Sequence, residues 1–419
     1  MCGVKPPPLK HDCFALPPGV HWTPVEEALA RLAERLDALT EVESCLVTQA
    51  AGRYLAEDVF ARSAHPPAAN SAVDGYALGA GLEPGLHHLP LTPGRAAAGA
   101  PYPTALARGY ALRILTGAPL PAGATTVVLE EDVVRAGGEI ALNGPVAPGA
   151  NVRSAGEDVA KGAHLLSAQR QLTAADLALL TATGHSQVRL HRRLRVAVLS
   201  TGDELAEPSP RVEAGMIFDA NRPMLLSILA RWGFEAIDLG RVGDDREKVS
   251  AALDHGARRA DAILTTGGAS AGDEDHISAL LNDRGAMATW RVAIKPGRPL
   301  ALGIWEGTPV FGLPGNPVAA FVCTLVFGWP ALRQLAGGSF EMPQSFSVPA
   351  GFTKRKKEGR TEYLRARIRD GRAEVFASEG SGRISGLSWA EGLVKLDPPA
   401  CEIAPGDLVS YIPFGSFGL

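Results

Sequence analysis

The chain has 419 residues and a formal net charge of −4, from 41 basic and 45 acidic side chains, which excludes a bulk electrostatic attraction to nucleic acid or to an anionic membrane. It contains 47 glycines and 32 prolines, which together stay below the roughly 25–30% at which a disordered chain is expected. With 46% apolar residues, this composition predicts about three folded domains joined by many rigid loops.

The five cysteines are scattered, without a CxxC motif or a Cys/His cluster at zinc spacing, which is typical of a protein of the reducing cytoplasm. The first residues contain the triplet Pro6–Pro8 and no apolar signal-peptide core. In the uncharged stretch at residues 315–332, Asn316 and Pro317 supply a cap and a first helical position. The stretch therefore predicts a buried helix and not a membrane span, and we expect a soluble protein.

The first half of the chain predicts two helices on either side of a β-rich insertion. Apolar residues recur at helical spacing over Val25–Leu39. Residues 61–149 are short apolar runs separated by Pro and Gly turns, which is typical of a compact β domain. A second helix is expected at Ala174–Thr183, where Thr173 and Asp176 form a capping box.

Strands and helices alternate after Leu194, which predicts right-handed βαβ units and a mostly parallel sheet. The expected strands are Arg195–Ser200, Phe234–Leu239, Ala262–Thr265, Trp290–Ile294, Leu300–Gly303 and Val310–Gly312. The expected helices are Asn221–Trp232, Arg246–Arg259, Ile277–Asn282 and a last one from Pro317 to near Gly338. From Phe340 onward short strands return and predict a small β-barrel or sandwich.

Three unusual loops follow expected parallel strands, at residues 200–204, 265–275 and 313–317. Ligands of open parallel sheets bind beyond the carboxyl ends of the strands, and glycine-rich loops let backbone N–H groups approach an anion. An ordinary connecting loop is the alternative for each of them. Neither GxxxxGK[ST] nor GxGxxG occurs, which excludes a Walker or Rossmann nucleotide site.

Carboxylates are expected at the same edge of the sheet, at Glu204, Asp244, Asp245, Asp273 and Asp275. Beside phosphate-binding loops such oxygens are suited to Mg²⁺, which takes one or two carboxylates plus substrate oxygens. Solvated loop ends are the alternative, and Asp244 or Asp245 could instead cap the helix that follows.

Two groups of cations suit an oxyanion. Arg291, Lys295 and Arg298 surround a proline-stiffened loop and predict a phosphate or oxyanion clamp. The run 354–369 has eight Lys or Arg, of which Arg365, Arg367 and Arg369 alternate at strand period and so share one face. A small-anion site or a solvated face explains this run better than a nucleic-acid surface.

In the β insertion, residues 70–78, 115–121 and 153–159 predict only turns when their chemistry is considered alone. A Ser/His/Asp triad has no support, because no GxSxG motif occurs.

Seven motifs follow one another along the chain. In chain order they are NSAVDGYAL, TGAPLPAGATTVV, GED, STGDEL, the TTGGAS–AGDED loop, AIKPGRP and LPGNP. In these motifs the chain closely resembles the MoeA family, the molybdopterin molybdenumtransferases, with related domains in plant proteins and in animal gephyrin. The resemblance extends from about Thr23 to the C-terminus. Two positions depart from it. Val73 stands where the family has a methionine, and Arg291 stands where the family has a lysine. At position 291 a planar guanidinium therefore replaces a compact ammonium group.

The resemblance implies an elongated homodimer of four-part subunits with a mixed α/β plus β fold. The parts would be helical domain I (residues 21–60 and 159–192), β-rich insertion domain II (61–158), the mostly parallel, MogA-like and molybdopterin-binding α/β domain III (193–338) and β-barrel domain IV (339–419). The implied active site is a cleft between domain II of one subunit and domains III and IV of the other.

The activity implied by the resemblance is Mg²⁺-dependent insertion of molybdate into adenylylated molybdopterin, with release of AMP, as the final step of molybdenum cofactor biosynthesis. The positions that match catalytic residues are Asp74, Thr116, Asp158, Glu204, Asp244, Asp275 and Lys295, with Glu204, Asp244 and Asp275 as metal ligands. The implied substrate-binding positions are Gly267, Gly268, Ser270, Pro314, Gly315, Asn316, Arg291, Arg365 and Ser381.

Two other functions stay open at this point. One is a molybdopterin-binding scaffold without catalysis, since the family includes proteins that cluster partners. The other is adenylylation of molybdopterin, a reaction of related α/β domains, against which the extra β domains argue. The implied partners are a second copy of this chain, a molybdopterin adenylyltransferase and maturation factors of molybdoenzymes, with no nucleic acid and no membrane.

Overall fold

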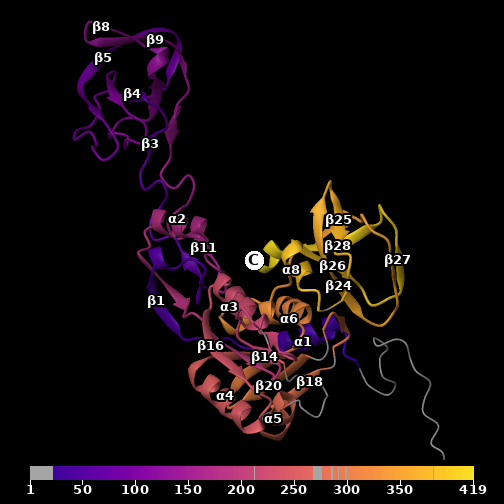
Figure 1. The fold of residues 1–419 in the computed structure, drawn as a ribbon. Coiled ribbons are helices and arrows are strands. Elements are labelled where there is room, and N and C mark those ends of the chain that lie inside the picture. The colour runs from indigo at the N-terminus through magenta and orange to yellow at the C-terminus, as the bar shows by residue number, and fades with distance from the viewer. Residues whose placement is uncertain are drawn as a thin grey trace, which may run out of the picture. The chain divides into compact units, whose positions relative to one another are not determined.

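The computed structural model describes residues 22–211, 213–267, 276–284, 286–290, 292–297, 300–380 and 382–419. These residues form two compact units (Figure 1). Unit 1 contains the described residues up to Val42 together with His191–Leu419, and unit 2 is Glu43–Leu190. The chain therefore leaves unit 1 after its first helix and returns to it at His191.

Unit 2 is mainly built of strands, with the helix α2 (Ala174–Ala182). The strands are β1 (Val42–Leu46), β2 (Val59–Phe60), β3 (Asn70–Ser71), β4 (Gly75–Leu78), β5 (Leu82–Ala96), β6 (Ala111–Ile114), β7 (Thr126–Leu129), β8 (Val134–Ala136), β9 (Glu139–Val146), β10 (Val152–Arg153), β11 (His164–Leu166) and β12 (Gln187–His191). The main sheet has the order β7-β4-β6-β5-β9-β8 and is antiparallel except between β5 and β6. Both faces of β4 are covered, because Ala77 lies in one apolar core and Tyr76 and Leu78 lie in another.

Helix α2 confirms the expected capping box. The Thr173 hydroxyl accepts a hydrogen bond from the Asp176 N–H at 3.3 Å, and the Asp176 carboxylate accepts one from the Thr173 N–H at 2.8 Å. These two bonds satisfy backbone donors that the first helical turn leaves unpaired. The helix ends before Gly184, which adopts a φ of +91°.

Most of unit 1 is an α/β layer structure. Its strands are β13 (Arg195–Thr201), β14 (Leu205–Ala206), β15 (Ile217–Phe218), β16 (Glu235–Val242), β17 (Ala262–Thr266), β18 (Ala286–Trp290), β20 (Leu300–Trp305) and β21 (Thr308–Leu313). Its helices are α1 (Val25–Arg35), α3 (Asn221–Arg231), α4 (Arg246–Arg259), α5 (His276–Arg284), α6 (Pro317–Cys323) and α7 (Trp329–Leu335). Helices α4 and α5 contact each other and the sheet, as do α3 and α6. Residues 196–201 of β13 are all buried, as expected for a strand covered by helices on both faces.

The sheet of unit 1 is parallel in only part of its width. In the order β16-β13-β17-β21-β20-β18, the first four strands are parallel, and β20 and β18 are antiparallel to their neighbours. The prediction of a mostly parallel sheet is therefore confirmed, but it did not include the antiparallel pairing at this edge. The reason is a two-residue turn at Glu306 and Gly307, with φ values of +47° and +79°, that joins β20 to β21 as a hairpin.

Two predicted boundaries also differ. The strand expected at Trp290–Ile294 is split, since β18 ends at Trp290 and β19 (Ile294–Lys295) pairs with β24 of the C-terminal sheet. Helix α1 ends at Arg35, because the Gln334 side chain donates to the carbonyl oxygens of Ala33 and Leu36 at 3.0 and 2.6 Å. Both differences come from tertiary contacts that the local pattern does not contain.

The helix expected from Pro317 is continuous but contains a wide turn. A π-helical turn at Thr324–Gly328 joins α6 to α7, immediately before Pro330, which has no N–H and cannot continue a regular helix. The segment Pro317–Leu335 is long and apolar enough to cross a membrane by composition, but 89% of it is buried in the protein. It is the core helix that the sequence predicts.

The C-terminal part of unit 1 is a β structure. Its strands are β22 (Phe346–Pro349), β23 (Lys354–Lys356), β24 (Thr361–Arg369), β25 (Arg372–Val375), β26 (Gly392–Leu396), β27 (Cys401–Ile403) and β28 (Leu408–Pro413), with the short helix α8 (Ser385–Trp389). The main sheet has the order β19-β24-β26-β28-β22, and β25 also pairs with β24. Its closure into a barrel stays a prediction.

Candidate active site

Two glycine loops meet at the carboxyl ends of the parallel strands in unit 1. Gly267 follows β17 with a φ of +89°, and a Cβ atom there would lie 2.2 Å from the Thr201 carbonyl oxygen at the end of β13. A Cβ on Gly315, after β21, would lie 3.5 Å from the Gly267 Cα. Only glycine fits at position 267, so the backbone of these loops is brought to one place, as the sequence predicts.

Asn221, at the start of α3, ties these loops together. Its side-chain amide donates to the Thr266 hydroxyl at 2.6 Å and to the Gly315 carbonyl oxygen at 2.7 Å. Asn316 caps α6 by accepting from the Val318 N–H at 3.2 Å, which confirms its predicted role as a cap. Sequence reasoning missed Asn221, since nothing in its local pattern distinguishes it from an ordinary helix-start residue.

Several buried polar atoms at these strand ends have no hydrogen-bond partner among the described residues. They are the hydroxyl oxygens of Ser200, Thr201 and Thr265 and the amide oxygen of Asn221. A buried polar group without a partner costs about 1–3 kcal/mol. Such atoms are suited to a polar ligand, which agrees with a site at this edge of the sheet.

A pair of carboxylates lies beside the glycine loops. The Asp203 N–H donates to Asp244 at 3.1 Å, and the Asp244 N–H donates to Asp203 at 3.0 Å. Asp245 instead caps α4, accepting from the backbone N–H groups of Glu247 and Lys248 at 3.0 and 2.9 Å. These bonds, above all the one from Lys248, hold the pKa of Asp245 below its usual range.

The two neighbouring aspartates of this loop therefore have different partners, because Asp245 caps α4 and Asp244 pairs with Asp203. Asp203 was missed by the sequence analysis, although it stands within the STGDEL motif. Glu204 is exposed. Among the described residues, no group of three His, Cys, Asp or Glu side chains gathers as a preformed metal site.

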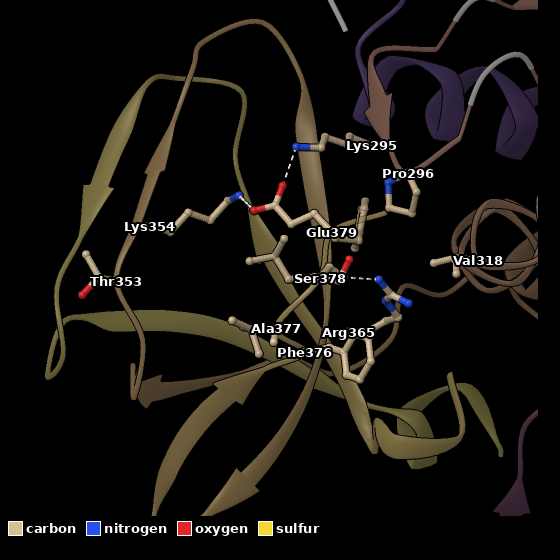
Figure 2. Close-up of a pocket in the computed structure, with 13 residues that line it drawn as sticks. Lys295, Pro296, Val318, Thr353, Lys354, Arg365, Phe376, Ala377, Ser378 and Glu379 are labelled. Carbon is tan, nitrogen blue, oxygen red and sulfur yellow. Dashed lines mark hydrogen bonds and ion pairs between the residues drawn. The ribbon is translucent and has the colours of Figure 1, made fainter. Parts of the chain in front are cut away.

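A second cluster lies under the C-terminal sheet, in a cavity of about 260 Å³. Figure 2 shows Lys295 and Lys354 both directed at the carboxylate of Glu379. The Lys295 ammonium lies 2.7 Å from Glu379 and 3.4 Å from Glu362, and Lys354 pairs with the same two carboxylates. Lys295, which the sequence places in a predicted oxyanion clamp, thus lies in this cationic cavity beside Lys354, which the sequence showed only as one member of a basic run.

The oppositely charged side chains of this cluster stabilise one another in their charged forms. Burial alone would raise the pKa of Glu379, but the hydrogen bonds from Lys295 and Lys354 outweigh it and hold the pKa below its usual range. Burial would likewise lower the pKa of Lys354, but Glu379 and Glu362 outweigh it and raise the pKa. Glu379 and Lys354 are therefore both charged at neutral pH.

Arg365, an expected substrate-binding residue, lines the same cavity. Its guanidinium donates to the carbonyl oxygens of Ser378, Gly380 and Arg383 and lies 4.9 Å from the ring centre of Phe376. Burial lowers its pKa. Arg365 therefore anchors the loop 378–383, within which Ser381 lies outside the described residues.

Unit 2 holds the pair formed by Asp74 and Thr116. The Thr116 backbone N–H and hydroxyl both donate to one Asp74 carboxylate oxygen at 2.7 Å. These bonds, led by the backbone N–H, hold the pKa of Asp74 below its usual range. Asp158 is exposed and its N–H donates to the His65 carbonyl oxygen at 3.2 Å, so no hydrogen bond joins it to this pair in the described structure.

The predicted site residues therefore fall into three groups. The strand-end group of unit 1 contains Glu204, Asp244, Gly267, Pro314, Gly315 and Asn316, and the cationic cavity contains Lys295 and Arg365. Unit 2 contains Asp74, Thr116 and Asp158. Gly268, Ser270, Asp275, Arg291 and Ser381 lie outside the described residues.

Comparison with known proteins accounts for nearly the whole chain. Residues 23–184 match the MoeA N-terminal region (domains I and II), residues 197–334 match a probable molybdopterin-binding domain, and residues 347–414 match the MoeA C-terminal region (domain IV). The molybdopterin molybdenumtransferase of Haemophilus influenzae is 34% identical, over 93% of this chain and 98% of the relative. Molybdopterin molybdenumtransferase 2 of Mycobacterium tuberculosis is also 34% identical, over 91% of this chain and 97% of the relative.

A solved structure shows the same fold. The molybdopterin biosynthesis MoeA protein of Pyrococcus horikoshii is 28% identical and superposes with a TM-score of 0.80, covering 94% of this chain and all of that one. Sequence, domain content and fold agree along the chain, so the protein belongs to the MoeA family of molybdopterin molybdenumtransferases.

Proposed function

We propose that this protein inserts molybdate into adenylylated molybdopterin, with release of AMP, in the final and Mg²⁺-dependent step of molybdenum cofactor biosynthesis in the cytoplasm. The observation that carries this proposal is the pair of neighbouring sites in unit 1. A backbone-lined strand-end site suits a phosphate-bearing pterin, and a lysine-lined cavity suits a tetrahedral oxyanion. Val318 of α6, which follows the LPGNP loop, lines the cavity, so one helix start borders both sites.

The strand-end site would hold the pterin and its phosphate linkage. Gly267, Gly315 and Asn316 expose backbone at the point where the sheet ends, and the unpaired hydroxyls of Thr201 and Thr265 supply further polar groups. We assign Pro314 to the same wall, and Gly268 and Ser270 to the continuation of the Gly267 loop. Together they would orient the substrate with few charged contacts.

The cationic cavity would hold molybdate. Lys295 and Lys354 are 19% and 9% exposed as side chains, so a bound dianion would meet partly desolvated ammonium groups, which strengthens the attraction. We assign Arg291 and Ser381 to the same oxyanion, while Arg365 would act by holding the loop that contains Ser381.

The carboxylates beside the strand-end site fit Mg²⁺ by their chemistry. Mg²⁺ takes one or two carboxylates and completes its shell with water and phosphate oxygens, which is what Asp244 and its neighbour Asp203 offer. We assign Glu204, Asp244 and Asp275 as the ligands. When bound, the ion would neutralise charge on the phosphate linkage.

Asp74 and Thr116 would complete the active site from a second subunit. The two Thr116 donors keep Asp74 ionised and oriented, and Asp158 would contribute from the same side. We propose a homodimer of four-part subunits with the domain boundaries given above, whose partners are a molybdopterin adenylyltransferase and maturation factors of molybdoenzymes.

The test is AMP release by the purified protein from adenylylated molybdopterin, with molybdate and Mg²⁺ added and omitted in turn. We expect release that requires both, and a loss of at least about a hundredfold in Asp244→Asn, since charge stabilisation by a positioned group is worth several kcal/mol. Tight molybdopterin binding without any release would indicate a scaffold instead. Formation of adenylylated molybdopterin from ATP would indicate an adenylyltransferase.

A further inference from the structure

The Glu379 carboxylate occupies the place in the cavity where an oxyanion would meet both lysines. It accepts a hydrogen bond from Lys295 at 2.7 Å and another from Lys354 (Figure 2). No described cation of the cavity other than Arg365 remains for a substrate, and Arg365 already donates to three carbonyl oxygens. An incoming dianion must therefore compete with Glu379 for these ammonium groups.

The two glutamates of the cluster differ in how firmly they are held. Glu362 lies on β24 and its side chain is 9% exposed, with longer contacts to Lys295 and Lys354 at 3.4 and 3.2 Å. Glu379 lies in the loop between β25 and α8, and its side chain is 47% exposed. Glu362 is thus built into the sheet, whereas Glu379 can turn out to solvent by rotation of its side chain.

The backbone on both sides of Glu379 is held by Arg365, which donates to the carbonyl oxygens of Ser378 and Gly380. Departure of Glu379 therefore requires only side-chain rotation and no opening of the loop. The two lysines and two glutamates form a neutral cluster. With the nearby Arg365 included, the cluster carries one net positive charge, and it carries two when Glu379 leaves, which matches a dianion.

We propose that Glu379 is an internal counter-anion, which pairs Lys295 and Lys354 in the free protein and sets the affinity for the oxyanion substrate by competing with it. This role rests on the proposed oxyanion cavity. Glu379 is a positioning and specificity residue here, since it touches no reacting atom. Its competition favours a doubly charged tetrahedral anion over a singly charged one, because only the stronger attraction displaces it.

The experiment measures molybdate binding to the full-length protein by titration calorimetry for the wild type, Glu379→Gln and Glu391→Gln. Glu391 is the matched control, since it accepts two hydrogen bonds from Arg369 outside the cavity and is 52% exposed. We expect Glu379→Gln to bind molybdate about three- to tenfold tighter, the scale of one partly exposed charge pair. Glu391→Gln should leave the affinity unchanged.

The kinetics of AMP release separate this role of Glu379 from a purely structural one. In Glu379→Gln the apparent KM for molybdate should fall by the same factor at an unchanged kcat. If Glu379→Gln binds molybdate no more tightly than the wild type while Lys295→Gln removes binding, the counter-anion role of Glu379 is overturned. The proposed oxyanion cavity is then still supported. Wild-type protein that neither binds molybdate nor releases AMP would overturn the proposed function and this inference with it.

Discussion

Single residues at the ligand edge of unit 1 are constrained by contacts from other strands. Gly267 is the sharpest case, because its positive φ and the Thr201 carbonyl oxygen each exclude a side chain. We expect Gly267→Ala to displace the loop and to lower molybdopterin affinity by at least about tenfold, since strain at such a position costs about 1–3 kcal/mol. The measurement is equilibrium binding of molybdopterin.

The control for this variant is Gly240→Ala. Gly240 has a similar φ of +76°, but a Cβ atom there would meet nothing within 4 Å. Alanine at position 240 therefore introduces the backbone strain without the clash. Equal binding losses in the two variants would show that the approach of Gly267 to Thr201 has no role in the site.

A second prediction at the residue scale concerns Asp261, which accepts hydrogen bonds from Arg192 and Arg195. Burial alone would raise the pKa of Asp261, but these arginines outweigh it and lower the pKa from 3.8 to about 2. Because the folded-state value is the lower one, the stabilisation is present above about pH 4 and is lost as pH falls toward 2.

We expect Asp261→Asn to lower the free energy of unfolding by about 2 kcal/mol at pH 7 and by much less near pH 2. Urea unfolding across this pH range checks it. Asp283→Asn serves as the comparison, because Asp283 is 59% exposed and its one ion pair among the described residues is with Arg246, so it should cost less than about 0.5 kcal/mol. A loss in Asp261→Asn that persists undiminished at acid pH would contradict the assignment.

At the scale of elements, strand β24 organises the C-terminal part of unit 1 through one face. Arg365 anchors the loop 378–383 by three carbonyl oxygens, while Arg367 lies over Trp389 at 4.4 Å and Arg369 pairs with Glu391. The alternation that the sequence shows is thus confirmed as a shared face. All three arginines of this face contact other groups of the protein.

We expect Arg365→Lys to loosen the loop 378–383, because a lysine ammonium cannot span three carbonyl oxygens in one plane. Hydrogen exchange of the loop amides should become about tenfold faster, the equivalent of about 1.4 kcal/mol. Arg367→Lys, which changes the neighbouring arginine on the same face, should leave that exchange unaltered. Similar rates in Arg365→Lys and the wild type would mean that other contacts hold the loop.

At the scale of the whole molecule, the candidate residues are divided between two units, with Asp74 and Thr116 in unit 2 and Lys295 and Asp244 in unit 1. If the active site combines these units from different subunits, two inactive variants should complement each other. Mixing and reassembling Asp74→Asn with Lys295→Gln should restore about a quarter of wild-type AMP release, because half of randomly formed dimers contain one intact site. No recovery, with dimers shown to exchange, would place the site within one subunit.

Much of unit 1 could be predicted because its local pattern agrees with its fold. Helix α4 begins and ends at Arg246 and Arg259 as predicted, and in unit 2 the Thr173 capping box forms as expected. The strand-end glycine loops were also found, since parallel strands bring their carboxyl ends to one edge. The antiparallel edge at β20 and β18 was missed because a two-residue turn reversed the chain where a crossover was expected.

The sequence by itself determined the order of elements, the glycine-rich strand ends and the family, because each of these depends on residues that lie close together along the chain. Only the tertiary structure decided which charges meet. Asp203 reaches Asp244 across 41 positions, and Lys295 reaches Glu379 across 84. It also decided that Arg365 binds carbonyl oxygens. Such pairings depend on how strands and loops approach in space, and local periodicity carries no information about that approach.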